Sequence, residues 1–206
     1  MPSIRLITLC GMIALLTGCS LFSPRSQISE QSQATPAQWK QHADTVEPIN
    51  SWDILGKIAI RTQQDSGSAN LMWKQNKQTF DITLVGPLGQ GATRLSGSPG
   101  FAQLNIANRG EFYAPNAEAL MDEHLGWNLP VERLLWWVRG LPSPASKNQV
   151  RLDSEGRLAQ LSQDGWNIHY LSYKEESSKN LPQRIKLQGN GIEITLVVKQ
   201  WQAQVR

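Results

Sequence analysis

Hydrophobic and polar residues alternate along most of the chain after residue 50, with the period of two that is typical of a half-buried β-strand. The first such segment places Trp52, Ile54, Ile58 and Ile60 at even positions, with Lys57 among the polar residues between them. Further alternating segments follow at 69–74, 80–85, 92–96, 104–106, 112–113, 158–162, 166–170, 185–187 and 192–198. The pattern predicts a mainly β protein.

Short turns connect these predicted strands. Asp164-Gly165 and Asn190-Gly191 are pairs that favour two-residue hairpin turns. About 11 strands joined by such turns predict a single antiparallel sheet with one apolar face. Because a large sheet curls, we expect an incomplete, half-open β-barrel.

Helices are predicted to cover the apolar concave face of this sheet. The segment Thr35–Gln38 has the composition of a capping box, with proline at the first helical position, and predicts a helix from 36 to about 45. Asn116 can cap a helix over 117–125, and Pro130 can open another. The fold class is therefore a curled sheet with an α-helical lid.

The N-terminus predicts export and lipidation. Residues 6–16 form an apolar run that is too short for a lasting membrane span but has the layout of a signal peptide. Leu16-Thr17-Gly18-Cys19 resembles the lipobox of bacterial lipoproteins, in which the cysteine thiol is alkylated by a diacylglyceryl group and the chain is cut before it. We expect a signal peptide over 1–18, a lipidated Cys19 with a flexible tether over 19–34, and a folded lipid-binding domain over 35–206.

The residue after the cysteine bears on the destination membrane. Ser20 stands where an aspartate would resemble an inner-membrane retention signal, so the resemblance implies a periplasm-facing protein of the outer membrane. Cys10 leaves with the signal peptide and Cys19 carries lipid, so we expect no disulfide. A coil of this length would hold the domain on the order of 20 Å from the bilayer.

Charge and side-chain chemistry exclude several classes of function. The net charge is +3 and the basic residues are scattered, which is atypical of a nucleic-acid-binding protein. His42, His124 and His169 are far apart, and we expect them to be solvated or hydrogen-bonded at the surface. No catalytic constellation, metal-ligand spacing or cofactor motif is apparent. The eight tryptophans suit either a bulky core or a wall against an apolar ligand.

The chain resembles the LolB family of outer-membrane lipoprotein receptors over nearly its whole length. The resemblance is carried by Leu16–Cys19, Gln38–His42, Gly56–Ala59, Met72–Gln75, Gly86–Gly89 and Trp137–Pro142. It implies a half-open antiparallel barrel that accepts the acyl chains of lipoproteins from the periplasmic carrier LolA. It further implies nucleotide-free delivery of that cargo into the outer-membrane lipid.

The resemblance also implies a function for Leu88, which lies in a glycine-rich turn. Taken alone, Leu88 would be a core residue folded back into the domain. However, Gly86 and Gly89 offer it little cover, and Pro87 stiffens the turn. The family implies an exposed loop, formed by these four residues, that acts in membrane delivery and not in the receipt of cargo.

The apolar positions of the predicted sheet and lid are candidates for contact with acyl chains. They are Ile58, Ile60, Leu71, Trp73, Phe80, Ile82, Leu84, Leu104, Ile106, Leu135 and Trp136. Alternation identifies the apolar face but not the part of it that is open, so plain core packing is the alternative for each residue. Two other functions stay open: a structural or assembly lipoprotein with a closed core, and a lipoprotein hydrolase. We expect the chain to act as a monomer.

Overall fold

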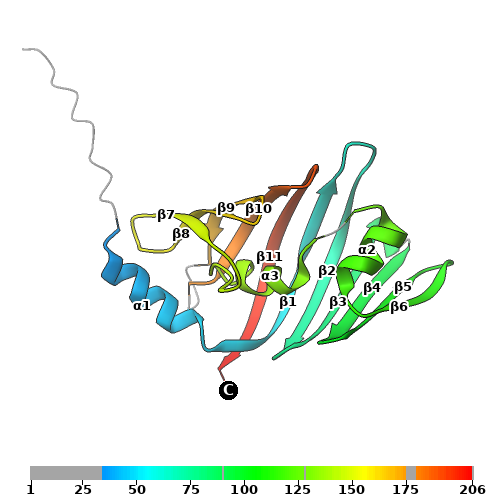
Figure 1. Ribbon diagram of the computed structural model, residues 1–206, viewed down its shortest axis with the longest axis horizontal. Coiled ribbons are helices and arrows are strands. Elements are labelled where there is room, and N and C mark those ends of the chain that lie inside the picture. The colour runs from blue at the N-terminus through cyan, green and yellow to red at the C-terminus, as the bar shows by residue number, and fades with distance from the viewer. Residues whose placement is uncertain (1–33, 90, 128, 175–179, 206) are drawn as a thin grey trace, which may run out of the picture. The chain divides into compact units, whose positions relative to one another are not determined.

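The computed structural model describes residues 34–89, 91–127, 129–174 and 180–205. The predicted signal peptide, Cys19 and nearly all of the tether lie outside these residues. The described part of the chain forms one antiparallel sheet of 11 strands, as the alternation and the turns predict (Figure 1). The strands are β1 Ile49–Arg61, β2 Ser66–Asn76, β3 Thr79–Val85, β4 Ala92–Ser98, β5 Phe101–Ile106, β6 Gly110–Ala114, β7 Asn148–Leu152, β8 Leu158–Gln163, β9 Trp166–Tyr173, β10 Pro182–Gly189 and β11 Ile192–Val205.

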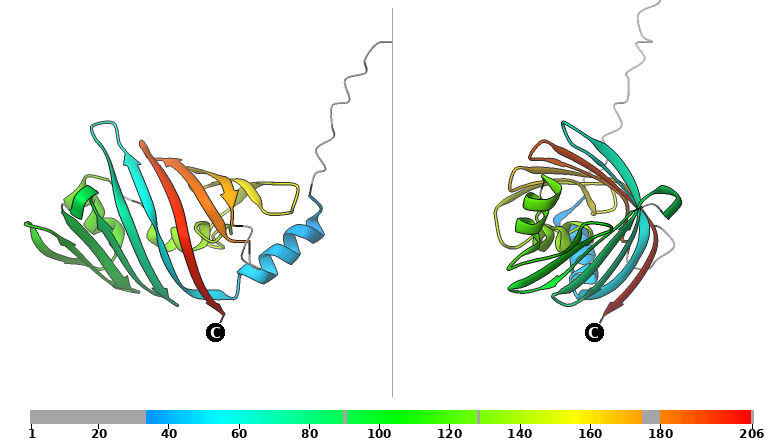
Figure 2. Two further views of the ribbon diagram at one scale, coloured as in Figure 1. Left: turned by 180° about the vertical axis from the view of Figure 1, so that it is seen from behind. Right: turned by 90° about the vertical axis from the view of Figure 1, so that its right-hand side faces the viewer.

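The strand order is that of an up-and-down barrel with one seam left open. The order is β6-β5-β4-β3-β2-β1-β11-β10-β9-β8-β7, so β1 pairs with β2 and β11, and β6 and β7 are the edges. Between β6 and β7 the chain forms α2 Ala117–Leu125 and α3 Val131–Trp137. Figure 2 shows the sheet curling around these two helices, which we call the lid. The predicted half-open barrel is thus confirmed.

The hairpin turns adopt the geometry that their sequences favour. Asp164 and Gly165 have φ values of 51° and 77°, and Asn190 and Gly191 have values of 50° and 74°. Two consecutive positive φ values define the type I′ turn, whose twist matches that of the flanking strands. The turns therefore fix the β8–β9 and β10–β11 registers locally.

The helix boundaries follow from capping side chains. α1 spans Pro36–Val46, and Thr35 and Gln38 form the predicted capping box: Thr35 N donates to Gln38 Oε1 at 2.8 Å and Gln38 N donates to Thr35 Oγ1 at 3.3 Å. Asn116 Oδ1 accepts from Ala119 N at 2.8 Å and starts α2, which ends at left-handed Gly126. In the described part of the chain, every helix is too short or too polar to cross a membrane.

The position of α1 overturns one expectation. His42 on this helix is buried, and its ring lies 6.2 Å from the rings of both Trp39 and Tyr173. Its Nε2 has no hydrogen-bond partner among the described residues. Burial, and then the nearby Arg157, lower the pKa of His42. The prediction of a solvated or hydrogen-bonded histidine is wrong at this position, because α1 packs against β9 and covers the ring.

A glycine in the central strand permits a close backbone approach. A Cβ at Gly56 would lie 2.3 Å from the carbonyl oxygen of Val197 on β11, at a point where the β1–β11 register shifts. Gly56→Ala is therefore expected to lower the free energy of unfolding by about 1–3 kcal/mol. The measurement is urea denaturation.

Gly67 on the neighbouring strand provides the matched control. A Cβ there would meet nothing within 4 Å, and alanine has the smaller conformational entropy in the unfolded chain. Gly67→Ala is expected to be neutral or slightly stabilising. Equal destabilisation by both substitutions would contradict the explanation from close contact.

Candidate functional site

A small apolar cavity lies between the concave face of the sheet and the lid. Its volume is about 70 Å³, and we call it the inner cavity. Its strand residues are Ile58, Ile60, Leu71, Trp73, Ile82, Leu84, Thr93, Leu95, Leu104, Leu187, Ile194 and Leu196. The residues from the lid side are Met121, Leu125, Trp127, Leu129, Val131 and Leu134.

Most residues singled out in the sequence meet at this cavity, but some do not. Those that line it are Ile58, Ile60, Leu71, Trp73, Ile82, Leu84 and Leu104. Phe80, Leu135 and Trp136 line a separate opening, and Ile106 lines a third. Alternation and helical periodicity identify the apolar side of an element but not the depth at which each residue lies.

Sequence reasoning missed the wall that the C-terminal strands contribute. Ile194 and Leu196 of β11 lie opposite Ile60 and Ile58 of β1. Their own alternation was visible, yet the pairing that brings them to this cavity joins strands far apart in the sequence. Met121 of α2 was missed because apolar helix residues usually pack in the core, and Trp127 was missed because it lies in the connection between α2 and α3.

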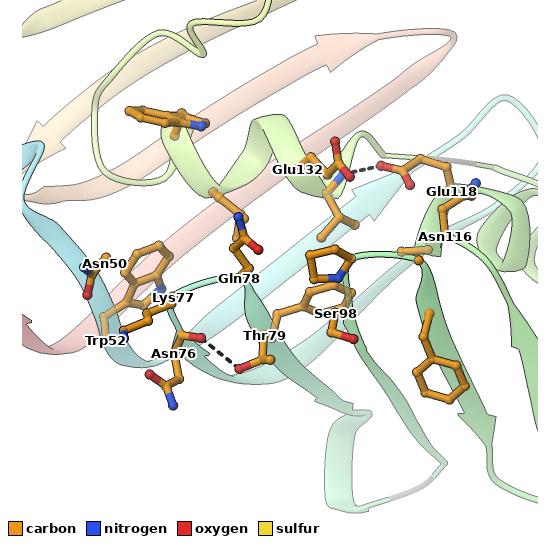
Figure 3. Close-up of a pocket in the computed structure, with 18 of the residues that line it drawn as sticks. Asn50, Trp52, Asn76, Lys77, Gln78, Thr79, Ser98, Asn116, Glu118 and Glu132 are labelled. Carbon is orange, nitrogen blue, oxygen red and sulfur yellow. Dashed lines mark hydrogen bonds between the residues drawn. The ribbon is translucent and has the colours of Figure 1, made fainter.

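A larger opening lies at the end of the barrel where the β2–β3 and β4–β5 turns are found. Its volume is about 1230 Å³, and its charged residues are Glu47, Lys77, Glu118, Glu132 and Arg139; we call it the charged mouth. Figure 3 shows Glu118 and Glu132 on its lid side and Asn76 and Thr79 on its strand side. Across the described residues, no three His, Cys, Asp or Glu side chains gather as metal ligands would.

Hydrogen bonds order the rim of the charged mouth. Val131 N, in the first turn of α3, donates to Glu118 Oε1 at 2.8 Å and so joins the two lid helices. Thr79 Oγ1 donates to the Asn76 carbonyl oxygen at 2.8 Å and fixes the β2–β3 turn. One hydrogen bond thus stabilises each side of the rim.

Arg139 fastens the end of the lid to the sheet. Its buried guanidinium donates to the carbonyl oxygens of Glu47 at 3.2 Å and Ile49 at 2.5 Å. It also lies over the rings of Trp52, at 5.3 Å from the centroid, and Trp136, at 4.7 Å. Burial lowers the pKa of Arg139 to about 10, which leaves the group cationic at neutral pH. The C-terminal end of α3 is therefore held at the start of β1.

A third opening lies at the opposite end of strand β3. Its volume is about 670 Å³, and we call it the Leu88-end mouth because Gly86 and Gly91, on either side of the Leu88 loop, form part of its wall. The other lining residues are Ile58, Ile60, Thr62, Gln64, Asp65, Ser66, Gly67, Ser68, Ala69, Leu84, Ala92, Thr93, Ile106, Ala107, Leu125, Gly126 and Trp127. The half-barrel thus has one charged and one largely uncharged end.

The glycine-rich loop directs Leu88 into solvent. Gly89 N donates to the Gly86 carbonyl oxygen at 3.2 Å and closes a tight turn around Pro87 and Leu88, and Gly86 N donates to the Gly91 carbonyl oxygen at 3.2 Å. The side chain of Leu88 is 96 % exposed, so the alternative of a folded-back core residue is wrong. Leu88 also has a φ of 59°, a left-handed conformation that is unfavourable for leucine. Exposure and backbone strain at one apolar residue, without compensating contacts, indicate a function outside the fold.

Comparison with known sequences gives one consistent result. A family model described as "Outer membrane lipoprotein LolB" matches residues 50–201. The chain is 47 % identical over 199 residues to an outer-membrane lipoprotein LolB of Pseudomonas syringae pv. syringae, covering 97 % of this chain and 96 % of the relative. It is 50 % identical over 191 residues to a LolB of Pseudomonas putida, covering 93 % of this chain and 92 % of the relative.

Comparison with solved structures concerns the fold alone. The chain is similar to a LolA superfamily protein from Nitrosomonas europaea, with a TM-score of 0.51 and 8 % sequence identity. The match covers 83 % of this chain and 94 % of the other. The overall fold of this chain is therefore similar to that of a LolA superfamily protein.

Proposed function

Because the chain belongs to the LolB family of outer-membrane lipoproteins, we propose that it accepts lipoproteins from the periplasmic carrier LolA and inserts them into the outer membrane. It is thus a lipoprotein-sorting protein. Cys19 anchors it through lipid, and its concave face holds the acyl chains of the cargo. The observation that carries the proposal is the inner cavity, whose wall is almost wholly apolar.

The architecture suits a ligand that must be bound and then released. Each CH₂ group removed from water contributes roughly 0.8 kcal/mol, so an acyl chain needs an apolar wall along most of its length. The sheet supplies one side of that wall. The other side is made of the lid helices, because the edge strands β6 and β7 do not pair with each other. The lid can therefore move without breaking sheet hydrogen bonds.

The inner cavity must enlarge to hold an acyl chain. A volume of about 70 Å³ has room for only a few water molecules. An acyl chain is far larger, so the space between the lid and the sheet must widen when cargo binds. The same small volume favours the second candidate function, a structural lipoprotein whose own side chains fill its core.

A transfer experiment tests the proposed function. LolA is loaded with a lipoprotein that carries radiolabelled acyl chains, and the full-length lipidated chain in nucleotide-free liposomes is added. We expect the cargo to move from the carrier to the liposomes intact. Cargo that stays on the carrier would exclude the receptor function, and released fatty acid would indicate a hydrolase.

A fluorescent fatty-acid analogue separates the receptor from the structural lipoprotein. A structural lipoprotein whose own side chains fill the space between sheet and lid offers the analogue no specific site. We expect the analogue to bind and to be released by unlabelled fatty acid. Absence of binding would favour the closed core.

A further inference from the structure

We propose that the Leu88-end mouth is the route by which acyl chains leave the inner cavity for the membrane, and that Trp127 closes this route. The inference rests on the proposed function. It assigns the delivery of acyl chains to the membrane to one of the two ends of the half-barrel.

The first argument is continuity between the inner cavity and the mouth. The residues common to both are Ile58, Ile60, Leu84, Thr93, Leu125 and Trp127. In contrast, Val131 is the lining residue that the inner cavity shares with the charged mouth. An acyl chain can therefore move from the cavity into the Leu88-end mouth while staying against apolar side chains.

The second argument is a decrease in side-chain size toward this end. The inward-facing residues of β2 are, in order, Trp73, Leu71, Ala69 and Gly67, and the last two line the Leu88-end mouth. A Cβ at Gly67 would meet nothing within 4 Å. The sequence of β2 thus widens the space between sheet and lid as it approaches the loop that carries Leu88.

The third argument is the chemistry of the two rims. Among the described residues, Asp65 is the one charged residue that lines the Leu88-end mouth, and its neighbours there include the hydroxyl side chains of Thr62, Ser66 and Ser68. Charged groups that lose water as an apolar chain passes would raise the free energy of passage. Desolvation of hydroxyl groups costs less free energy. Hydroxyl groups can also donate hydrogen bonds to the ester and amide carbonyls at the head of an acylated cysteine. The charged mouth is less suited to that passage.

Trp127 lies at the boundary between the inner cavity and this mouth. It directly follows Gly126, whose φ of 73° ends helix α2. Its half-buried ring packs against the core and lines both spaces. Rotation of the backbone at the end of the helix would move one ring and connect the cavity with the mouth.

Site-specific cross-linking tests the route. The full-length lipidated chain is prepared with Leu88→Glu, which is expected to hold accepted cargo, and with p-benzoylphenylalanine in place of either Trp127 or Trp136. Both tryptophans are half-buried and pack against the core, but Trp136 lines the charged mouth. After loading from LolA with radiolabelled cargo, we expect several-fold more acyl cross-linking at 127 than at 136. Equal cross-linking, or more at 136, would overturn the inference.

A second variant tests the route without a cross-linker. Gly67→Phe adds a ring to open space in the Leu88-end mouth, and Gln78→Phe adds one at the exposed β2–β3 turn of the charged mouth. We expect Gly67→Phe to slow delivery into liposomes several-fold and Gln78→Phe to deliver at the normal rate. Normal delivery by Gly67→Phe would overturn the proposed route. Failure of the unsubstituted chain to remove cargo from LolA would instead contradict the proposed function, so the two failures are distinguishable.

Discussion

Leu88→Glu is expected to accept lipoprotein from the carrier normally and to insert it into membranes roughly 100-fold or more slowly. Burial of a leucine side chain contributes about 1.5–3 kcal/mol, and burial of an unpaired polar group costs about 1–3 kcal/mol more. Each 1.4 kcal/mol corresponds to about tenfold in a rate. Acceptance should be unchanged, because Leu88 is 96 % exposed and lines none of the three spaces described above.

The experiment follows both steps with the same cargo. Loss of labelled lipoprotein from LolA measures acceptance, and quenching of a fluorescent acyl chain by spin-labelled lipid in the liposome measures insertion. Leu171→Glu is the matched control, because Leu171 is a 54 % exposed leucine on strand β9. We expect it to behave as the unsubstituted chain does. Normal insertion by Leu88→Glu would mean that the loop is only a turn.

A glycine at the same position separates function from folding stability. Leu88 has a φ of 59°, and relief of a left-handed conformation should stabilise the chain by roughly 1–2 kcal/mol. Leu88→Gly is therefore expected to be at least as stable as the unsubstituted chain, while inserting cargo slowly because the apolar side chain is absent. Thermal unfolding and the insertion assay measure the two properties independently.

The fold could be predicted from the sequence because its determinants are local. Asp164-Gly165 and Asn190-Gly191 fix two hairpins, and period-two alternation assigns one face of each strand to the interior. The capping residues Thr35 and Asn116 likewise mark the starts of α1 and α2. None of these features depends on contacts between distant parts of the chain.

The site could be predicted only in part, because its depth and boundaries depend on distant pairings. Phe80 and Trp136 are apolar and face inward, yet they lie at the charged mouth because their elements extend past the inner cavity. Leu196 enters the cavity wall through its pairing with Ile58, and the two residues lie at opposite ends of the domain sequence. The burial of His42 also depends on a distant contact, with Tyr173.

Leu84→Asp is expected to weaken the binding of a fatty-acid analogue by roughly 10–100-fold. Leu84 lines both the inner cavity and the Leu88-end mouth, so a carboxylate there must lose water as an acyl chain enters. An unpaired buried polar group costs about 1–3 kcal/mol, and about 1.4 kcal/mol corresponds to tenfold in affinity. The residue is only half-buried, so the fold should tolerate the substitution. Fluorescence titration measures the affinity, and thermal unfolding verifies the fold.

Substitution of the adjacent residue, Val85, provides the control that distinguishes a ligand cavity from a closed core. Val85 is also half-buried but is the next residue of β3, so alternation turns it to the opposite face. Val85→Asp should bind the analogue as the unsubstituted chain does. If both variants bind equally well, the acyl chain does not contact the concave face at Leu84, and the wall of the inner cavity is then a core. A selective loss at Leu84, with equal stability of the two variants, would mean that the bound acyl chain lies against the concave face of the sheet at Leu84.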